Sequence, residues 1–328
     1  MDKTIKTAVT IFHSAPKNGI IICAKQRKES ACFPRCERKC PPVLYPQDNL
    51  QKALDSAQPG DVIDLGPGDF RCKLMLTVPG VTLRGAGAEQ TRIVWDDYAQ
   101  KLDDQGREYN TFRTWTVAVC ADGVRMEDLS VVNDALRPEE KGQEVALTVY
   151  GDDFHMENCR LSSTQDTLFL GPLPRDLIAR YDGFLPDILR RDIPCRQFFK
   201  GCLIEGTVDF IFGCGQALFE NCEIRSLVEV RGHGYLAAPA HALEQTGGFL
   251  FRNCRLSAQS GVAPGSVYLA RPWRDYGLCE FLDCAIEGDH IAPEGFHKWN
   301  DTHRDKTARF YETPLPPGRV AWARTRQK

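Results

Sequence analysis

Two stretches of the chain repeat one pattern: MENCRLSSTQDT at residues 156–167 and FKGCLIEGTVDF at residues 199–210. In each copy an aspartate lies seven residues after the cysteine, and these aspartates are Asp166 and Asp209. If the copies are successive turns of a stacked solenoid, equivalent residues lie one above the other on neighbouring strands about 4.8 Å apart. The pattern therefore predicts that the two carboxyl groups form a pair.

The frame around the cysteine recurs further along the chain. Five of the 14 cysteines lie in similar frames, in which an apolar residue follows two positions later: Cys159, Cys202, Cys222, Cys254 and Cys284. Cysteine is often buried and packs as a small hydrophobic residue. We therefore expect a stacked internal ladder of reduced thiols rather than disulfides, which suits a reducing compartment.

Spacings of 43, 20, 32 and 30 residues between these cysteines indicate a repeat architecture with insertions. Between the frames lie short segments rich in β-branched and apolar residues, such as VPGVTL at residues 78–83. We predict an all-β fold, a single-stranded right-handed parallel β-helix, over residues 46–328. A β-sandwich is the alternative, but it does not explain the repeated frame. Residues 171–194, rich in Pro, Asp and Arg, are expected to form an insertion.

The ends of a solenoid must be covered, because exposed sheet edges recruit other chains. Residues 48–57 have apolar residues at helical spacing and a Pro-Gly stop, which predicts a short N-terminal capping helix. Residues 1–45 are expected to be a poorly ordered extension. Their four cysteines leave metal binding open, although the Cys-x3-Cys-x3-Cys spacing is not typical of zinc sites.

The composition narrows the possible partners. A net charge of −3 over 328 residues gives no sign of a nucleic-acid surface. No apolar run reaches the roughly 20 residues that a membrane span needs. The apolar stretch at residues 8–12 is too short for the core of a signal peptide, which needs about 7–15 residues. We expect a cytoplasmic monomer.

Four motifs occur in order: GQEVAL at residues 142–147, QDTL at 165–168, GTVDFIFG at 206–213 and LARPW at 269–273. Their order and spacing over about residues 45–312 resemble the pectin methylesterases (pectinesterases). The resemblance implies a right-handed parallel β-helix with an exposed groove. It also implies hydrolysis of the methyl esters of galacturonate units in pectin or oligogalacturonides, which releases methanol and needs no metal or other cofactor.

The resemblance also assigns roles to residues of the motifs. Asp209 would be the nucleophile, and Asp166 the general acid and then the base that activates water. Arg271 would hold Asp209 in its anionic form. Gln143 and Gln165 would donate hydrogen bonds to the oxyanion, and one such donor is typically worth about 3–4 kcal/mol.

The physics of the aspartate pair agrees with these roles. Two carboxylates about 5 Å apart repel by roughly 3 kcal/mol at an effective dielectric constant near 20, or about two pKa units. The pair therefore tends to share one proton. Strict strand alternation places Asp166 and Asp209 on the outer face but turns Gln165 inward. A bend or bulge near Gln165 is required if its amide is to reach the oxyanion.

Four aromatic residues are candidates for contacts with sugar faces: Trp273, Phe212, Phe169 and Trp299. Phe169 stands where the family usually has tyrosine, and it could equally be a core residue. The stretch GFHKW at residues 295–299 keeps only the second of two tryptophans that the family tends to carry. These departures concern sugar contacts rather than the reaction.

Three other functions remain open. Paired carboxylates about 5 Å apart also suit a retaining glycoside hydrolase. A lyase of this architecture generally needs calcium, for which the sequence has no well-placed acidic cluster. A non-catalytic pectin-binding scaffold would not need every reactive position intact. For an esterase, the expected lack of an export signal and the insertion at residues 171–194 favour short oligogalacturonides as substrates.

Overall fold

The computed structural model describes residues 42–135, 142–181, 185, 187–193 and 195–326. The predicted extension at residues 1–45 lies almost entirely outside the described residues. Leu44 nevertheless forms a parallel bridge with Leu65 and packs against the core, so the first turn of the fold begins before residue 46.

Three parallel sheets make up the described part of the chain. The nine-stranded sheet contains, in spatial order, β1 (Val62–Asp64), β4 (Thr82–Arg84), β7 (Arg125–Glu127), β10 (Phe154–Glu157), β13 (Arg196–Lys200), β16 (Gln216–Glu220), β19 (Phe249–Arg252), β22 (Leu278–Leu282) and β24 (Arg309–Thr313). The eight-stranded sheet contains β2 (Gly68–Arg71), β5 (Thr91–Trp95), β8 (Ser130–Asn133), β11 (Arg160–Ser162), β14 (Leu203–Gly206), β17 (Glu223–Ser226), β20 (Arg255–Ala258) and β23 (Ala285–Ile286). The seven-stranded sheet contains β21 (Val267–Ala270), β18 (Gly234–Pro239), β15 (Ile211–Gly213), β12 (Leu168–Leu170), β9 (Leu147–Val149), β6 (Val117–Val119) and β3 (Leu74–Leu76).

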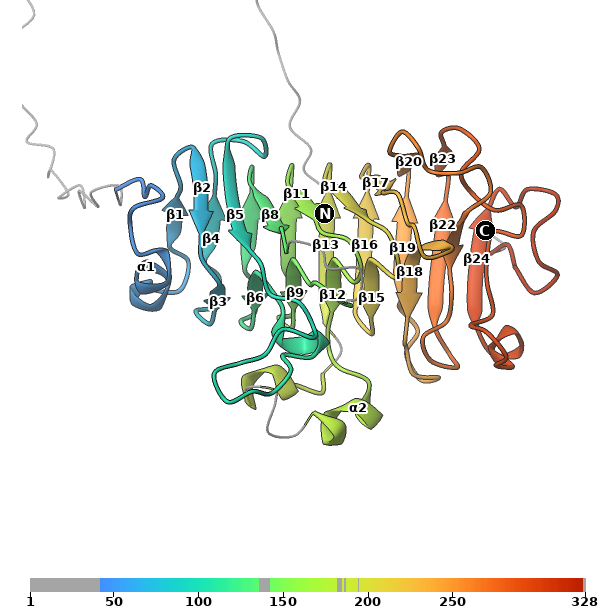
Figure 1. The fold of residues 1–328 in the computed structure, drawn as a ribbon, viewed down its shortest axis with the longest axis horizontal. Helices are drawn as coiled ribbons and strands as arrows, with labels where there is room; N and C mark the ends of the chain where they lie inside the picture. Colours follow the sequence, from blue (N-terminus) through green and yellow to red (C-terminus); the bar gives the residue numbers. More distant parts are fainter. Residues whose placement is uncertain (1–41, 136–141, 182–184, 186, 194, 327–328) are drawn as a thin grey trace, which may run out of the picture. The chain divides into compact units, whose positions relative to one another are not determined.

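The chain visits the three sheets in turn, so that each strand pairs with the equivalent strands of the turns before and after it (Figure 1). For example, β10 pairs in parallel with β7 on one side and with β13 on the other. This is a parallel β-helix, and the predicted fold class is confirmed.

The cysteine frame forms the corner between the nine-stranded and eight-stranded sheets. The residue before each cysteine has a positive φ of 52–61°, a conformation that Gly, Asn and Asp adopt most readily: Asn158, Gly201, Asn221, Asn253 and Asp283. Each of the five thiols donates to a backbone carbonyl of the preceding turn; that of Cys202, for example, donates to Met156 at 3.4 Å. All ten described cysteines are free, and the predicted thiol ladder is confirmed.

A second ladder lies in the same core. The rings of Phe199, Phe219, Phe251 and Phe281 stack on successive turns, with centroids 4.6–4.8 Å apart. These spacings equal the distance between neighbouring strands, so each turn buries an aromatic ring against the next.

The N-terminal end of the β-helix is covered by α1 (Leu50–Ser56), close to the predicted helix. The Asn49 side chain caps its first turn, and Leu50 and Leu54 are buried. The amide of Gln51 exchanges hydrogen bonds with the backbone of Met75 in β3, at 2.9 and 3.0 Å. Because β3 is the terminal strand of its sheet, this contact satisfies an otherwise open edge.

Beside the seven-stranded sheet, two long connections form a lobe (Figure 1). One contains the 3-10 helix η1 (Thr111–Arg113), and the other is the predicted insertion, with α2 (Arg175–Arg180) and the 3-10 helix η2 (Asp187–Arg190). A third 3-10 helix, η3 (Arg304–Lys306), precedes β24.

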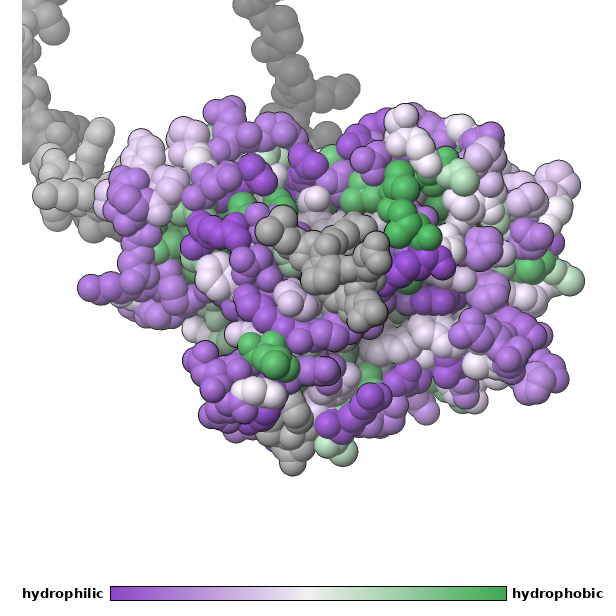
Figure 2. Space-filling model, viewed as in Figure 1, coloured by the Kyte–Doolittle hydropathy of each residue, from purple (hydrophilic) through white to green (hydrophobic). Residues whose placement is uncertain are grey.

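The face in Figure 2 is mainly hydrophilic, with small hydrophobic patches. None of the helices in the described residues is long and apolar enough to cross a membrane.

Candidate active site

Asp166 and Asp209 are brought together by the pairing of β12 with β15. Leu168 lies opposite Ile211, so the same register continued backwards places Asp166 opposite Asp209. The backbone supports this alignment, because the N–H of Asp166 donates to the carbonyl of Val208 at 3.0 Å. The two aspartates thus occupy one position on neighbouring turns, as the repeat predicted.

Both aspartates have left-handed backbone conformations, with φ of 65° at Asp166 and 50° at Asp209. Aspartate tolerates this conformation better than most residues do. The bend at residues 164–166 interrupts the alternation of side chains before β12 starts. Gln165 therefore lines the same pocket as Asp166, and the bend predicted near Gln165 is present.

A pocket of about 520 Å³ lies over this corner. Eight of the nine candidate residues line it: Gln143, Gln165, Asp166, Asp209, Phe212, Arg271, Trp273 and Trp299. They come from several turns of the β-helix, which the parallel register brings side by side.

Arg271 is held firmly against Asp209. Its guanidinium donates to both carboxylate oxygens of Asp209, at 2.8 and 2.6 Å. Its guanidinium carbon also lies over two aromatic rings, 3.9 Å from the centroid of Tyr235 and 4.1 Å from that of Trp299. A bidentate, stacked arginine keeps a fixed geometry that a lysine would not reproduce. Tyr235 lies outside the recognised motifs, which therefore gave no signal for it.

The environments of the two carboxyl groups differ. Burial and the charge of Asp209 raise the pKa of Asp166 well above its usual value, and Arg271 and a hydrogen bond from Gln165 oppose the shift only in part. Burial also raises the pKa of Asp209, but there the paired guanidinium of Arg271 opposes the shift directly. Of the two carboxyl groups, only that of Asp209 is hydrogen-bonded to the guanidinium, so a proton shared by the pair is favoured on Asp166.

The prediction that Phe169 contacts sugar is wrong. Phe169 is fully buried and packs against Phe112 and Phe212, each with ring centroids 5.0 Å away. Phe169 is buried because the lobe covers this part of the seven-stranded sheet. It packs beneath Phe112 and Phe212, which line the pocket. Phe212 is 3% exposed and lines the pocket, while Trp273 and Trp299 are half-buried at its rim.

The lobe supplies pocket residues that sequence reasoning missed. Phe112 comes from the connection that contains η1, and Leu177, Arg180 and Tyr181 come from the insertion. The ring of Tyr181 packs edge-on against that of Phe112, with centroids 5.0 Å apart. Neither segment belongs to the repeat, so the periodicity carried no signal for their placement.

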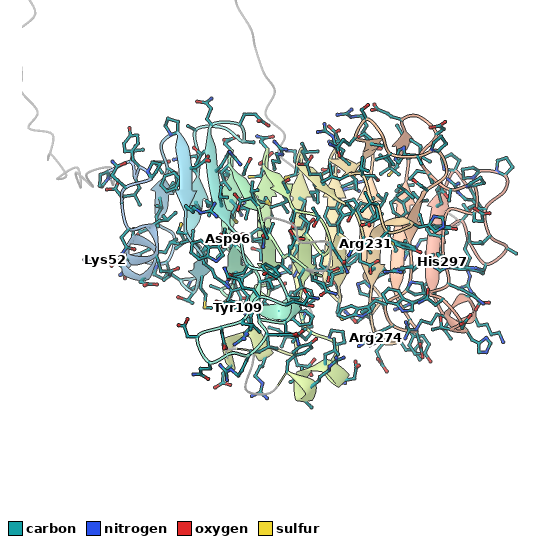
Figure 3. The ribbon with its side chains drawn as sticks, in the orientation of Figure 1. Lys52, Asp96, Tyr109, Arg231, Arg274 and His297 are labelled. Carbon is teal, nitrogen blue, oxygen red and sulfur yellow. The ribbon has the colours of Figure 1, made fainter. Side chains whose placement is uncertain are left out.

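The insertion is also tied to the Arg271-Pro272-Trp273 segment. Arg274, labelled in Figure 3, pairs with both carboxylate oxygens of Asp176 in α2, at 3.2 and 2.8 Å. This contact holds α2 against the rim of the pocket. The insertion predicted at residues 171–194 therefore borders the pocket.

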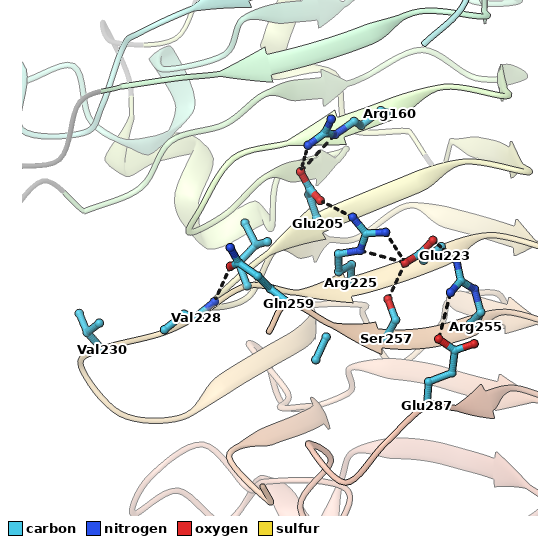
Figure 4. A pocket seen from close by; sticks show the side chains of 12 residues that line it. Arg160, Glu205, Glu223, Arg225, Val228, Val230, Arg255, Ser257, Gln259 and Glu287 are labelled. Carbon is cyan, nitrogen blue, oxygen red and sulfur yellow. Dashed lines mark hydrogen bonds and ion pairs between the residues drawn. The ribbon is translucent and has the colours of Figure 1, made fainter. Parts of the chain in front are cut away.

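A larger hollow of about 800 Å³ lies elsewhere, on the eight-stranded sheet (Figure 4). Its charged residues pair with one another in a ladder across successive strands: Arg160, Glu205, Arg225, Glu223, Arg255 and Glu287. Each carboxylate of this ladder faces an arginine, whereas residues of all four sequence motifs line the smaller pocket. We therefore assign the chemistry to the smaller pocket.

Fold and site together define a class of protein: a parallel β-helix enzyme with an aspartate pair in an arginine-anchored pocket. A profile of the pectinesterase family matches residues 47–172 and 191–326. The chain belongs to the pectinesterase family of hydrolases. The match omits residues 173–190, which contain α2.

Relatives and solved structures agree with this assignment. Pectinesterase 31 of Arabidopsis thaliana is 29% identical over 297 residues, which cover 84% of this chain and 83% of that protein. Probable pectinesterase 8 of the same plant is 30% identical over 278 residues, covering 80% of this chain and 62% of that protein. The structure of pectin methylesterase from carrot has a TM-score of 0.72 at 24% identity, covering 86% of this chain and 85% of that one. That of Yersinia enterocolitica pectin methylesterase has a TM-score of 0.69 at 25% identity, covering 85% and 94%.

Proposed function

We propose that this chain hydrolyses the methyl esters of galacturonate units in pectin or in oligogalacturonides derived from it, and releases methanol. The observation that carries the proposal is the aspartate pair, in which Arg271 holds one member by two hydrogen bonds and burial raises the pKa of the other. A pectin methylesterase of similar fold has been solved in complex with a hexasaccharide, which supports a carbohydrate substrate.

In the first step, the ionised carboxylate of Asp209 attacks the ester carbonyl carbon. The negative charge that develops on the carbonyl oxygen accepts hydrogen bonds from the amides of Gln143 and Gln165. As the C–O bond to the methoxy group breaks, Asp166 transfers its proton to the departing oxygen, and methanol leaves. The product is an anhydride between Asp209 and the galacturonate carbonyl.

In the second step, Asp166 is ionised and acts as a base. It removes a proton from a water molecule that attacks the anhydride carbonyl, and the same donors stabilise the second oxyanion. The tetrahedral intermediate collapses to restore ionised Asp209 and to release the galacturonic acid unit, which then loses its remaining proton to solvent. Asp166 keeps the proton taken from water, so the pair again holds one proton.

We propose further that the enzyme prefers short oligogalacturonides. The insertion supports this, because Leu177, Arg180 and Tyr181 line the pocket and the family match omits this segment. Side chains added at the rim shorten the groove available to a long polymer. Arg180 is exposed and adds a positive charge that suits the free carboxylates of partly demethylated substrates.

We also propose that the enzyme works in a reducing compartment such as the cytoplasm. Support comes from the ten free cysteines of the described residues, eight of which are buried. Burial raises the pKa of the Cys159 and Cys195 thiols to about 12, so these two thiols stay protonated and inert. Exported small domains are typically held together by disulfides, whereas the described cysteines of this chain are free and mostly packed in its interior.

The experiment is methanol release from methylated galacturonate oligomers of graded length and from polymeric pectin, with a chelator present. We expect methanol without new reducing ends, and the highest kcat/KM with short oligomers. New reducing ends would indicate a glycoside hydrolase or a lyase instead. A preference for polymeric pectin would refute the short-substrate proposal but not the esterase proposal.

A further inference from the structure

Arg231 contacts a residue of the candidate active site from outside the pocket. Its Nη2 donates a hydrogen bond to the side-chain oxygen of Gln165 at 3.2 Å. Arg231 follows β17 in a loop that none of the recognised motifs contains. It borders a second, shallower hollow of about 250 Å³ beside the pocket, and Figure 3 labels it.

Arg231 is itself held by a buried carboxylate. The guanidinium of Arg231 donates to both oxygens of Glu229, at 2.9 and 3.1 Å, and the backbone N–H of Arg231 donates to the same side chain at 2.8 Å. The Glu229 side chain is only 6% exposed, against 49% for that of Arg231. Burial pushes the pKa of Glu229 upward, but the hydrogen bonds and charge of Arg231, together with the hydroxyl of Thr207, outweigh burial, and the net pKa is lowered.

The contact determines which way the amide of Gln165 faces. A glutamine amide has an acceptor oxygen at one end and a donor NH2 group at the other, whereas a guanidinium only donates. With its oxygen turned to Arg231, the amide presents its NH2 group to the pocket, where Asp166 lies and where the oxyanion would form. The reversed amide would place donor against donor at Arg231 and acceptor against the oxyanion.

We propose that Glu229 and Arg231 are positioning residues that orient the amide of Gln165 as an oxyanion donor. The inference rests on the proposed function, because it concerns one of the two donors of that mechanism. Preorganised donors stabilise a developing charge without reorganisation during the reaction. Removal of the Arg231 side chain leaves the amide of Gln165 in place but free to reverse. It should therefore lower kcat less than removal of the amide itself.

The test is a double-mutant cycle on methanol release with Arg231→Ala, Gln165→Ala and the combined variant. We expect Arg231→Ala to lower kcat about tenfold with little change in KM, and Gln165→Ala to lower it about a hundredfold. In the Gln165→Ala background, Arg231→Ala should have no further effect, because the group that it orients is gone. Arg231→Lys, which keeps a donor, should recover part of the loss.

Arg252→Ala is the matched control, since it removes a similar ion pair, with Glu220, on the nine-stranded sheet, where neither residue lines the pocket or the hollow beside it. It should leave kcat unchanged. Additive losses in the cycle would overturn the proposal, because they would mean that Arg231 acts independently of Gln165. So would a displaced pH profile with an unchanged maximum, which would mean that Arg231 acts through its charge alone. If Gln165→Ala itself is fully active, the oxyanion assignment of the proposed function fails instead.

Discussion

At the scale of single residues, the site depends on two backbone conformations. Asp166 and Asp209 both adopt positive φ, which moves the preceding residue out of strict alternation. The repeat predicted the aspartate pair because residues at equal distances along the chain from Cys159 and Cys202 lie opposite each other in neighbouring turns. It could not place Gln165, since alternation rules hold only inside strands. Phe169 was wrongly predicted to contact sugar because the residue that buries it, Phe112, lies in a segment remote in sequence.

Replacement of Asp166 by asparagine should stabilise the protein at neutral pH. An unfolded aspartate loses its proton near pH 3.9. The pKa of Asp166 in the folded state is raised by burial and by Asp209, so above pH 3.9 the folded state binds more protons and stability falls as pH rises. Asparagine cannot ionise, so it removes this loss of stability at neutral pH while keeping the shape of the side chain.

Thermal unfolding of both proteins between pH 3.5 and 8 measures this effect. The melting temperature of Asp166→Asn should exceed that of the wild type at pH 7, and the difference should shrink toward acid pH. A wild type that is the more stable protein at pH 7 would contradict the raised pKa.

Arg271→Lys should shift the pH profile of the reaction. Asp209 must be ionised to attack, and the two hydrogen bonds from Arg271 oppose the upward shift of its pKa. Lysine keeps the charge but loses the bidentate geometry and the stacking, so the pKa of Asp209 rises further. The acidic limb of the kcat/KM profile should move to higher pH, with a lower maximum. An unmoved acidic limb would show that Arg271 does not set the ionisation of Asp209.

At the scale of elements, the repeated frame predicted the corners of the β-helix better than its connections. Residues such as Asn158 and Gly201 mark each corner because few residue types tolerate positive φ there. The insertion was recognised by its composition, but α2 and its contact with Arg274 were not. The packing of such a segment depends on contacts with residues remote in sequence, as between Asp176 and Arg274, and no repeat in the sequence indicates these contacts.

Asp176→Ala tests the role of the insertion without altering a pocket residue. Loss of the ion pair between Asp176 and Arg274 should loosen α2 from the rim. Because exposed pairs contribute about 0.2–1 kcal/mol, KM for short oligomers should rise by up to about fivefold at nearly constant kcat. The control is Asp187→Ala, which removes an exposed carboxylate of η2 in the same insertion. Equal effects in both variants, or none in either, would contradict a role for this contact.

At the scale of the whole molecule, the parallel β-helix makes the site from turns that are distant in sequence. Stacked thiols and phenylalanine rings hold successive turns in register, and that register aligns Asp166 with Asp209. The fold class and the central residues could be predicted because the repeat is visible in the sequence. The pocket walls could not, since they come from the lobe outside the repeat.

Methanol release by Asp209→Asn tests the central claim most directly. Asparagine preserves the shape of the side chain but removes the attacking carboxylate. We expect methanol release to fall by about a thousandfold or more, with the thermal unfolding midpoint and the binding of a methylated oligogalacturonide retained. Methanol release within about tenfold of the wild-type rate would show that Asp209 is not the nucleophile.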